Sequence, residues 1–176
     1  MILRDLSEDD KIKFNEIHSC YRYTMLYAAK SILKDDDLAE DAVQESFIKL
    51  ARYINRIGDV KSNKTRSFVH IIAKHVAIDI YRKRKHENCV YVEEFYEIES
   101  KNSVDTQVIK NLEVQEIVTM IIDMPELYRE PLKLNLIYEI PPKEVADILN
   151  LNYELVKKRI QRGKSILREK LNSKDY

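Results

Sequence analysis

The sequence predicts an all-α protein made of two small helical domains that are joined by a flexible linker. Its 176 residues include only two glycines and four prolines, so tight turns are scarce. Apolar residues recur at steps of three and four over long stretches, which is typical of amphipathic helices. Residues 86–104 lack this period and are rich in glutamate, serine and asparagine, which indicates a linker.

Three helices are expected in the first domain, at about residues 9–32, 38–57 and 66–85. The acidic stretch "KDDDLAED" lies at the start of the second helix, where negative charge is favourable. Between the second and third helices, "RIGDVKSNKTR" combines turn-forming residues with basic ones. We expect this stretch to be a loop that can approach phosphates.

Two basic regions flank an acidic middle, although the net charge of the whole chain is zero. Residues 1–86 hold 17 basic and 13 acidic residues, whereas residues 87–112 hold two and six. We place the domains at 1–86 and 105–176, with the linker at 87–104. The stretch "VYVEEFYEI" inside the linker also fits a short strand.

The second domain is expected to end in a helix-turn-helix. After helices at about 105–123 and 127–138, a short helix spans 143–149. Asn150 then suits a sharp left-handed turn and Asn152 suits the N-cap of a last helix.

The last helix is predicted to have one buried and one basic face. Val156, Ile160, Gly163 and Leu167 fall on one stripe at about 100° per residue. The other side carries the candidate major-groove contacts, which are Lys157, Lys158, Gln161, Arg162 and Lys164. An ordinary amphipathic hairpin with a solvated basic face fits the same pattern.

The second helix carries a candidate docking surface for another protein. Its buried stripe leaves Asp41, Gln44, Glu45 and the apolar Ile48 on the other side. An apolar residue ringed by charges suits a protein interface, although a single exposed isoleucine is also normal.

The third helix, in "FVHIIAKHVAIDIYRKRK", carries a candidate surface for unpaired bases. Beside its main apolar stripe lies a second row with Phe68, His75 and Arg82, and Asp79 is at its edge. Aromatic and cationic groups in one row can stack bases and neutralise a backbone, with Asn63, Lys64 and Arg66 of the preceding loop nearby. The alternative is that Phe68 and Ile71 form a second layer of core and the basic end is solvated.

Other classes of function find no support in the sequence. No paired-carboxylate cleft, phosphate-binding glycine loop or metal cluster is visible, so we expect no enzyme, no cofactor and no metal. Cys20 and Cys89 lack any ligand spacing and are expected to be reduced thiols. No apolar run reaches the length of a membrane span, so we expect a cytoplasmic protein without membrane insertion.

Three stretches resemble, in the same order, regions 2.1 to 2.2, 2.3 to 2.4 and 4 of bacterial sigma factors. They are "DLAEDAVQESFIKLARY", "FVHIIAKHVAIDIYRKRK" and "MPELYREPLKLNLIYEIPPKEVADILNLNYELVKKRIQRGKSILREKL". The two-domain size is similar to that of the extracytoplasmic-function (ECF) subgroup of the sigma-70 family. The resemblance implies a promoter-specificity subunit whose partners are core RNA polymerase and promoter DNA, and many relatives also have an anti-sigma factor.

The resemblance assigns roles to the residues that match the family's motifs. Asp41, Gln44 and Glu45 would bind the largest subunit of the polymerase, with Phe47 in support. The third helix would read and open the minus-10 element, and the last helix would read the minus-35 element.

Four positions depart from the family's pattern. Phe68 and His75 stand where the family has tryptophan and asparagine. Glu154 and Leu155 replace a small residue and a threonine, and an acidic Glu154 near phosphates would weaken binding unless it points away or caps the helix.

Two other functions fit parts of the sequence. A conventional helix-turn-helix regulator would bind its duplex tightly without polymerase. A sigma-like adaptor would keep the fold and bind no DNA.

Overall fold

The computed structural model describes residues 6–87 and 112–173, and the chain divides into two compact units, Met1–Glu93 and Glu94–Tyr176. The described residues form helices and contain no strand, which confirms the all-α prediction. Apart from Glu87, the last residue of α3, the predicted linker lies outside the described residues, as do the "VYVEEFYEI" stretch and Cys89.

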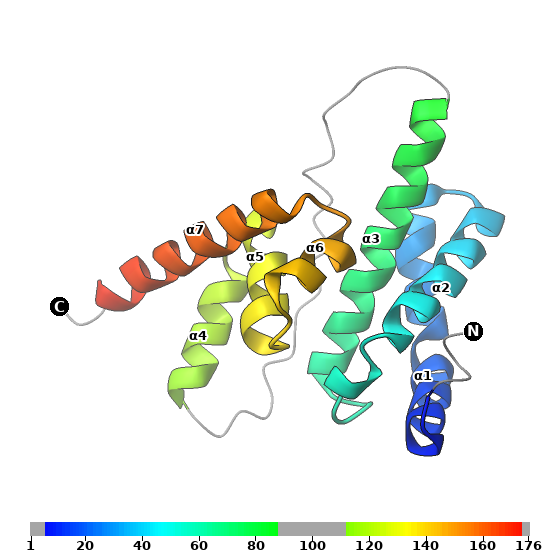
Figure 1. Ribbon diagram of the computed structural model, residues 1–176, viewed down its shortest axis with the longest axis horizontal. Helices are drawn as coiled ribbons and strands as arrows, with labels where there is room; N and C mark the ends of the chain where they lie inside the picture. Colours follow the sequence, from blue (N-terminus) through cyan, green and yellow to red (C-terminus); the bar gives the residue numbers. More distant parts are fainter. Residues whose placement is uncertain (1–5, 88–111, 174–176) are drawn as a thin grey trace. The chain divides into compact units, whose positions relative to one another are not determined.

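The first unit is a bundle of three long helices that lie side by side (Figure 1): α1 (Glu8–Leu33), α2 (Asp36–Ala51) and α3 (Asn63–Glu87). Each helix packs against the other two. Their shared core contains the fully buried Ile17, Met25, Leu50 and Ile72. Such a core removes the apolar stripe of every helix from water, which is the main stabilising contribution for short helices.

Side chains define where these helices begin. The Ser7 hydroxyl accepts a hydrogen bond from the Asp10 N–H at the start of α1, and the Asp35 carboxylate accepts one from the Leu38 N–H at the start of α2. Between α1 and α2, Lys34 takes a left-handed conformation with φ 53°. These caps explain why the connection between the two helices is so short.

Two boundaries differ from the sequence prediction. The predicted helix 38–57 ends at Ala51 and is followed by a 3₁₀ turn, η2 (Ile54–Arg56). The helix predicted from residue 66 begins at Asn63, because the Ser62 hydroxyl accepts a hydrogen bond from the Thr65 N–H and so caps an earlier first turn. The basic loop is therefore shorter than expected, and Asn63, Lys64 and Arg66 lie on α3.

The second unit consists of α4 (Leu112–Ile122), α5 (Glu126–Leu132), a π-helical turn η3 (Lys133–Ile137), α6 (Pro142–Leu149) and α7 (Tyr153–Asn172). The helix predicted at 127–138 is thus divided into α5 and η3, and Pro131, which has no backbone N–H to donate, lies near the division. The predicted helix 105–123 is described from Leu112 onward.

The helix-turn-helix is built as the sequence predicts. Asn150 is left-handed (φ 48°, ψ 49°), and the Asn152 side chain accepts hydrogen bonds from the N–H groups of Glu154 and Leu155. Gly163 allows α7 to approach α5 closely, since an added Cβ would lie 2.7 Å from Leu132 Cδ1. These features fix which face of α7 is turned to solvent.

Candidate docking and DNA-binding surfaces

The outer face of α2 carries all four predicted docking residues. Asp41, Gln44, Glu45 and Ile48 are exposed, and 52% of Ile48 is accessible. They lie at steps of three and four residues, so they form one stripe. We call this stripe the α2 face.

The inner side of α2 is held by α1. The Phe47 ring packs against Phe14 and His18, with centroid distances of 5.9 and 4.6 Å. About one turn after His18 on α1, Arg22 forms an ion pair of 3.1 Å with Glu40 of α2. Phe47 is therefore a supporting residue, and the α2 face is presented by a fixed helix.

Asp35, the N-cap residue of α2, also binds the basic end of α3. The second carboxylate oxygen of Asp35 accepts a hydrogen bond from the Arg84 guanidinium at 3.0 Å. The Leu38 N–H, and after it Arg84, lower the pKa of the Asp35 carboxyl, because both favour its charged form. This contact between "KDDD" and "YRKRK" is one that helical periodicity does not reveal, since the partners are 49 residues apart.

The structure contradicts the assignment of Phe68 as a base-stacking residue. Only 1% of Phe68 is exposed, Ile71 beside it is also buried, and the Phe68 ring meets Tyr53 edge-on at 6.2 Å. The physical reason is that Tyr53, at the start of the 3₁₀ turn, covers this part of α3. The alternative, in which Phe68 and Ile71 form a second layer of core, is correct.

The other predicted minus-10 residues do not form one surface. Lys64 and Arg82 are exposed and fall on the same side of α3 as the half-buried His75, whereas Asp79 is 9% exposed. Asn63 is half-buried in the first turn. Lys64, His75 and Arg82 thus remain as candidates on one stripe, which we call the α3 stripe.

Arg66 faces a different part of the unit. Two residues correspond to about 200° around a helix, so Arg66 is turned away from Lys64. Burial raises the pKa of Tyr21 on α1, whose hydroxyl donates to the Val60 carbonyl at 2.7 Å, and the charge of Arg66 opposes that rise. Arg66 is therefore near the Tyr21 hydroxyl and apart from the α3 stripe.

The exposed side of α7 carries the predicted minus-35 residues. Lys157, Lys158, Gln161 and Arg162 are exposed, and Lys164 is half-buried at the edge. The opposite side, with Val156, Ile160, Gly163 and Leu167, is buried. We call the four exposed residues the α7 face.

Not every basic residue of α7 belongs to this face. Arg159 is 9% exposed, and its Nε atom has no hydrogen-bond partner. Sequence spacing separates Arg159 from the α7 face, because Arg159 falls only about 40° around the helix from Gly163 of the buried stripe.

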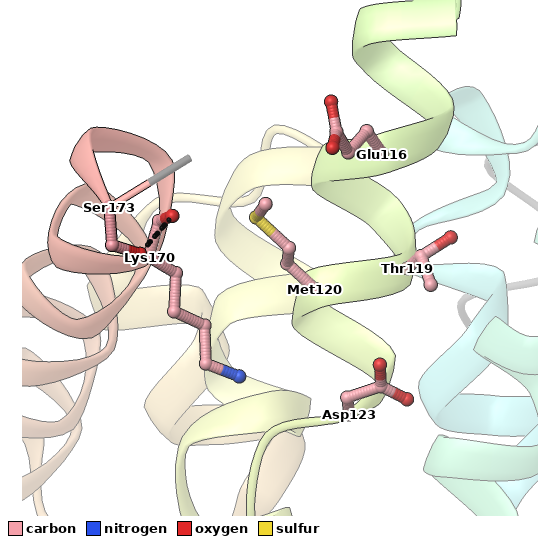
Figure 2. A pocket seen from close by; sticks show the side chains of 6 residues that line it. All are labelled: Glu116, Thr119, Met120, Asp123, Lys170 and Ser173. Carbon is pink, nitrogen blue, oxygen red and sulfur yellow. Dashed lines mark hydrogen bonds between the residues drawn. The ribbon is translucent and has the colours of Figure 1, made fainter. Parts of the chain in front are cut away.

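The second unit also has a shallow groove at the other end of α7. Figure 2 shows its lining, with Lys170 and Ser173 on one side and residues of α4 on the other. The α4 residues are Glu116, Thr119, Met120 and Asp123. The Ser173 hydroxyl donates to the Lys170 carbonyl at 2.9 Å, and the groove shares no residue with the α7 face.

The described residues offer neither a metal cluster nor a membrane-spanning helix. They contain no group of three or more histidine, cysteine, aspartate or glutamate side chains that is placed to hold a metal ion. No helix among them is both long and apolar enough to cross a membrane.

Comparison with known protein families gives matches in both units. Residues 17–87 match Sigma-70 region 2, and residues 114–167 match Sigma-70, region 4. Together the two matches span well over half of the chain, in the order that the sequence motifs predict. The chain belongs to the sigma-70 family.

Curated relatives agree with this assignment. The chain is 26% identical to the ECF RNA polymerase sigma factor SigW of Bacillus subtilis (strain 168), over 96% of this chain and 94% of the relative. It is 28% identical to the ECF RNA polymerase sigma factor SigM of the same organism, over 90% and 94%. The prediction of an ECF sigma factor is confirmed.

Among solved structures, the chain is similar to the sigma factor RpoE of Bartonella quintana, solved in complex with the anti-sigma factor NepR. The two chains are 20% identical, with 90% of this chain and 96% of that chain covered and a TM-score of 0.39.

Sigma-factor membership also rules out the conventional helix-turn-helix regulator that the sequence left open. The first unit matches region 2 across all three helices, which a conventional regulator with an unrelated sensing domain would not do. As a sigma factor, the protein directs promoter-specific initiation of transcription.

Proposed function

We propose that three surfaces of this sigma factor have separate roles in initiation. The α2 face binds core RNA polymerase, the α3 stripe contacts the minus-10 element, and the α7 face reads the minus-35 element. The observation that carries this proposal is that the α2 and α7 faces are both exposed, each is presented by a capped helix, and they differ in charge. The corresponding domains are 1–86 and 105–176, with 87–104 as linker.

The α7 face has the chemistry of a major-groove reader. In a helix-turn-helix, the second helix enters the major groove and its N-terminal residues contact base edges. Lysine and arginine side chains donate to guanine, and glutamine pairs with adenine. Lys157, Lys158, Gln161 and Arg162 supply these groups from the first half of α7.

The α3 stripe supports promoter opening as a binding effect. Opening a duplex costs on the order of 1.4 kcal/mol per base-pair step. Stacking of a released base on a protein side chain returns roughly 1 to 3 kcal/mol. Since Phe68 is buried, His75 is the candidate ring for this contact, and Lys64 and Arg82 would hold the backbone.

No catalytic role and no cofactor form part of this proposal, because a sigma factor works by binding. The cytoplasm, where promoter DNA and polymerase meet, is the proposed location. An anti-sigma factor is a further proposed partner.

Loss of two cations from the α7 face tests the minus-35 assignment. In the double variant Lys157→Ala, Arg162→Ala, we expect initiation at promoters selected by their minus-35 sequence to fall by about 10-fold or more, because each base contact contributes roughly 1 to 3 kcal/mol. The measurement is run-off transcription with purified core polymerase.

The matched control removes two cations from the far end of the same helix. Arg168→Ala, Lys170→Ala lowers the charge of α7 equally, and both residues are exposed. We expect initiation to change by less than about threefold, as for contacts that do not read bases. If both double variants initiate equally, the α7 face does not read the minus-35 element.

A further inference from the structure

Glu154 is an acidic residue at the end of α7 that should enter the DNA. It is the second residue of the helix, two positions after the N-cap Asn152, and its side chain is exposed. At about 100° per residue it falls between Lys157 and Lys158 and within about 20° of Gln161. Glu154 therefore belongs to the same side of α7 as the α7 face.

The structure gives the Glu154 carboxylate no local role. The cap at this end of α7 is made by Asn152, whose side-chain oxygen accepts from the N–H groups of Glu154 and Leu155. Within the residues that the structure describes, the carboxylate itself has neither a hydrogen bond nor an ion pair. It neither caps the helix nor turns away from the α7 face.

A carboxylate at this place weakens binding to any DNA, because it is repelled by phosphates. It is also an acceptor only, so it cannot bond to the acceptor groups of guanine or to the O4 atom of thymine. Cytosine offers a donor in the major groove, its N4 amino group, and has no acceptor of its own there. Adenine has an amino donor as well, but its neighbouring N7 acceptor repels a carboxylate.

We infer that Glu154 accepts a hydrogen bond from the N4 amino group of a cytosine in the minus-35 element. Glu154 is then a specificity-determining residue, which favours cytosine and disfavours the other three bases at the position read by the first turn of α7. The inference rests on the proposed function, since it requires the α7 face to lie in the major groove.

The neighbouring residues fit this reading. Lys158 and Gln161 follow Glu154 by four and seven residues and are exposed, so the three form one row along the helix. The row contains an acceptor only, a donor only and a group that does both. Such a row can distinguish successive bases by whether each side chain donates or accepts the hydrogen bond.

Selection from a promoter library tests the inference. Core polymerase with the full chain initiates on templates whose minus-35 region is random, and the bases enriched in transcribed templates are counted. We expect the natural chain to enrich one cytosine by about fivefold or more. In Glu154→Gln that enrichment should fall below about twofold, while the other enriched bases persist.

Glu169→Gln is the matched control. Glu169 is exposed on the same helix, 15 residues later and about 22 Å away, and its replacement changes the charge equally. This variant should retain the cytosine enrichment in full. Thermal unfolding of all three proteins should agree, since both glutamates are exposed surface residues.

The outcomes separate this inference from the proposed function. If the natural chain enriches a minus-35 element and Glu154→Gln enriches the same cytosine, Glu154 does not read a base and the inference is wrong, while the α7 assignment stands. If the natural chain enriches no minus-35 sequence, the proposed function of α7 fails first and the inference fails with it.

Discussion

Replacement of Phe68 by alanine is expected to lower the free energy of unfolding of the first unit by about 3–5 kcal/mol. Phe68 is almost completely buried and packs edge-on against Tyr53. Its removal would leave a cavity between α3 and the segment that follows α2. Chemical denaturation of the full chain, followed by far-ultraviolet circular dichroism, measures the loss.

A smaller replacement separates packing from base contact. Phe68→Leu keeps most of the buried volume, so we expect a cost near 1 kcal/mol and normal promoter opening. Opening is measured as permanganate reactivity of unpaired thymines in complexes with core polymerase. If Phe68→Leu is stable but opens no promoter, the ring acts on bases as the family's tryptophan is expected to do, and the packing account is wrong.

Charge reversal on the α2 face is expected to abolish binding to core polymerase. Asp41→Lys, Glu45→Lys places two cations where the α2 face offers two carboxylates beside Ile48. Like charges opposed across an interface cost several kcal/mol, so affinity should fall by about 100-fold or more. Size-exclusion chromatography with purified core polymerase, followed by titration with a labelled chain, gives the measurement.

Two acidic residues on α1 provide the control for this prediction. Asp9→Lys, Glu16→Lys makes the same change of charge on another exposed helix of the same unit. We expect binding to core polymerase within about threefold of the natural chain. Charges outside the interface are far from the partner, and salt largely screens their effect on it. Equal loss of binding in both double variants would show that total charge, and no particular face, controls association.

The fold was predictable from local signals wherever these agreed with one another. Around α7, the turn at Asn150, the cap at Asn152 and the stripe beginning with Val156 all pointed to one helix and one exposed face. The four docking residues on α2 were found by the same means. Periodicity sufficed there because each helix has a single buried side.

Phe68 could not be assigned in this way. α3 packs against both α1 and α2, and Tyr53 covers its second stripe as well. The period of one helix shows that such a stripe is apolar, but it contains no information on whether a segment 15 residues earlier lies over it. The same limit applies to Arg84 and Asp35, whose ion pair depends on how three helices pack.

The short basic loop gives a second example. "KSNKTR" contains turn formers, yet Ser62 caps a helix that begins directly at Asn63. The extra turn separates Lys64 and Arg66 onto different sides of α3. Lys64 and Arg66 are close in sequence, but they therefore do not belong to one site.

The most direct test of the sigma-factor account is transcription by purified core polymerase on a library of random promoters, with and without this chain. The account predicts that specific start sites arise only when the chain is present, and that their templates share two elements at a fixed spacing. It also predicts weak binding of the chain alone to those templates. Specific starts that do not depend on the chain, or tight binding of the free chain to duplex DNA without any initiation, would contradict it.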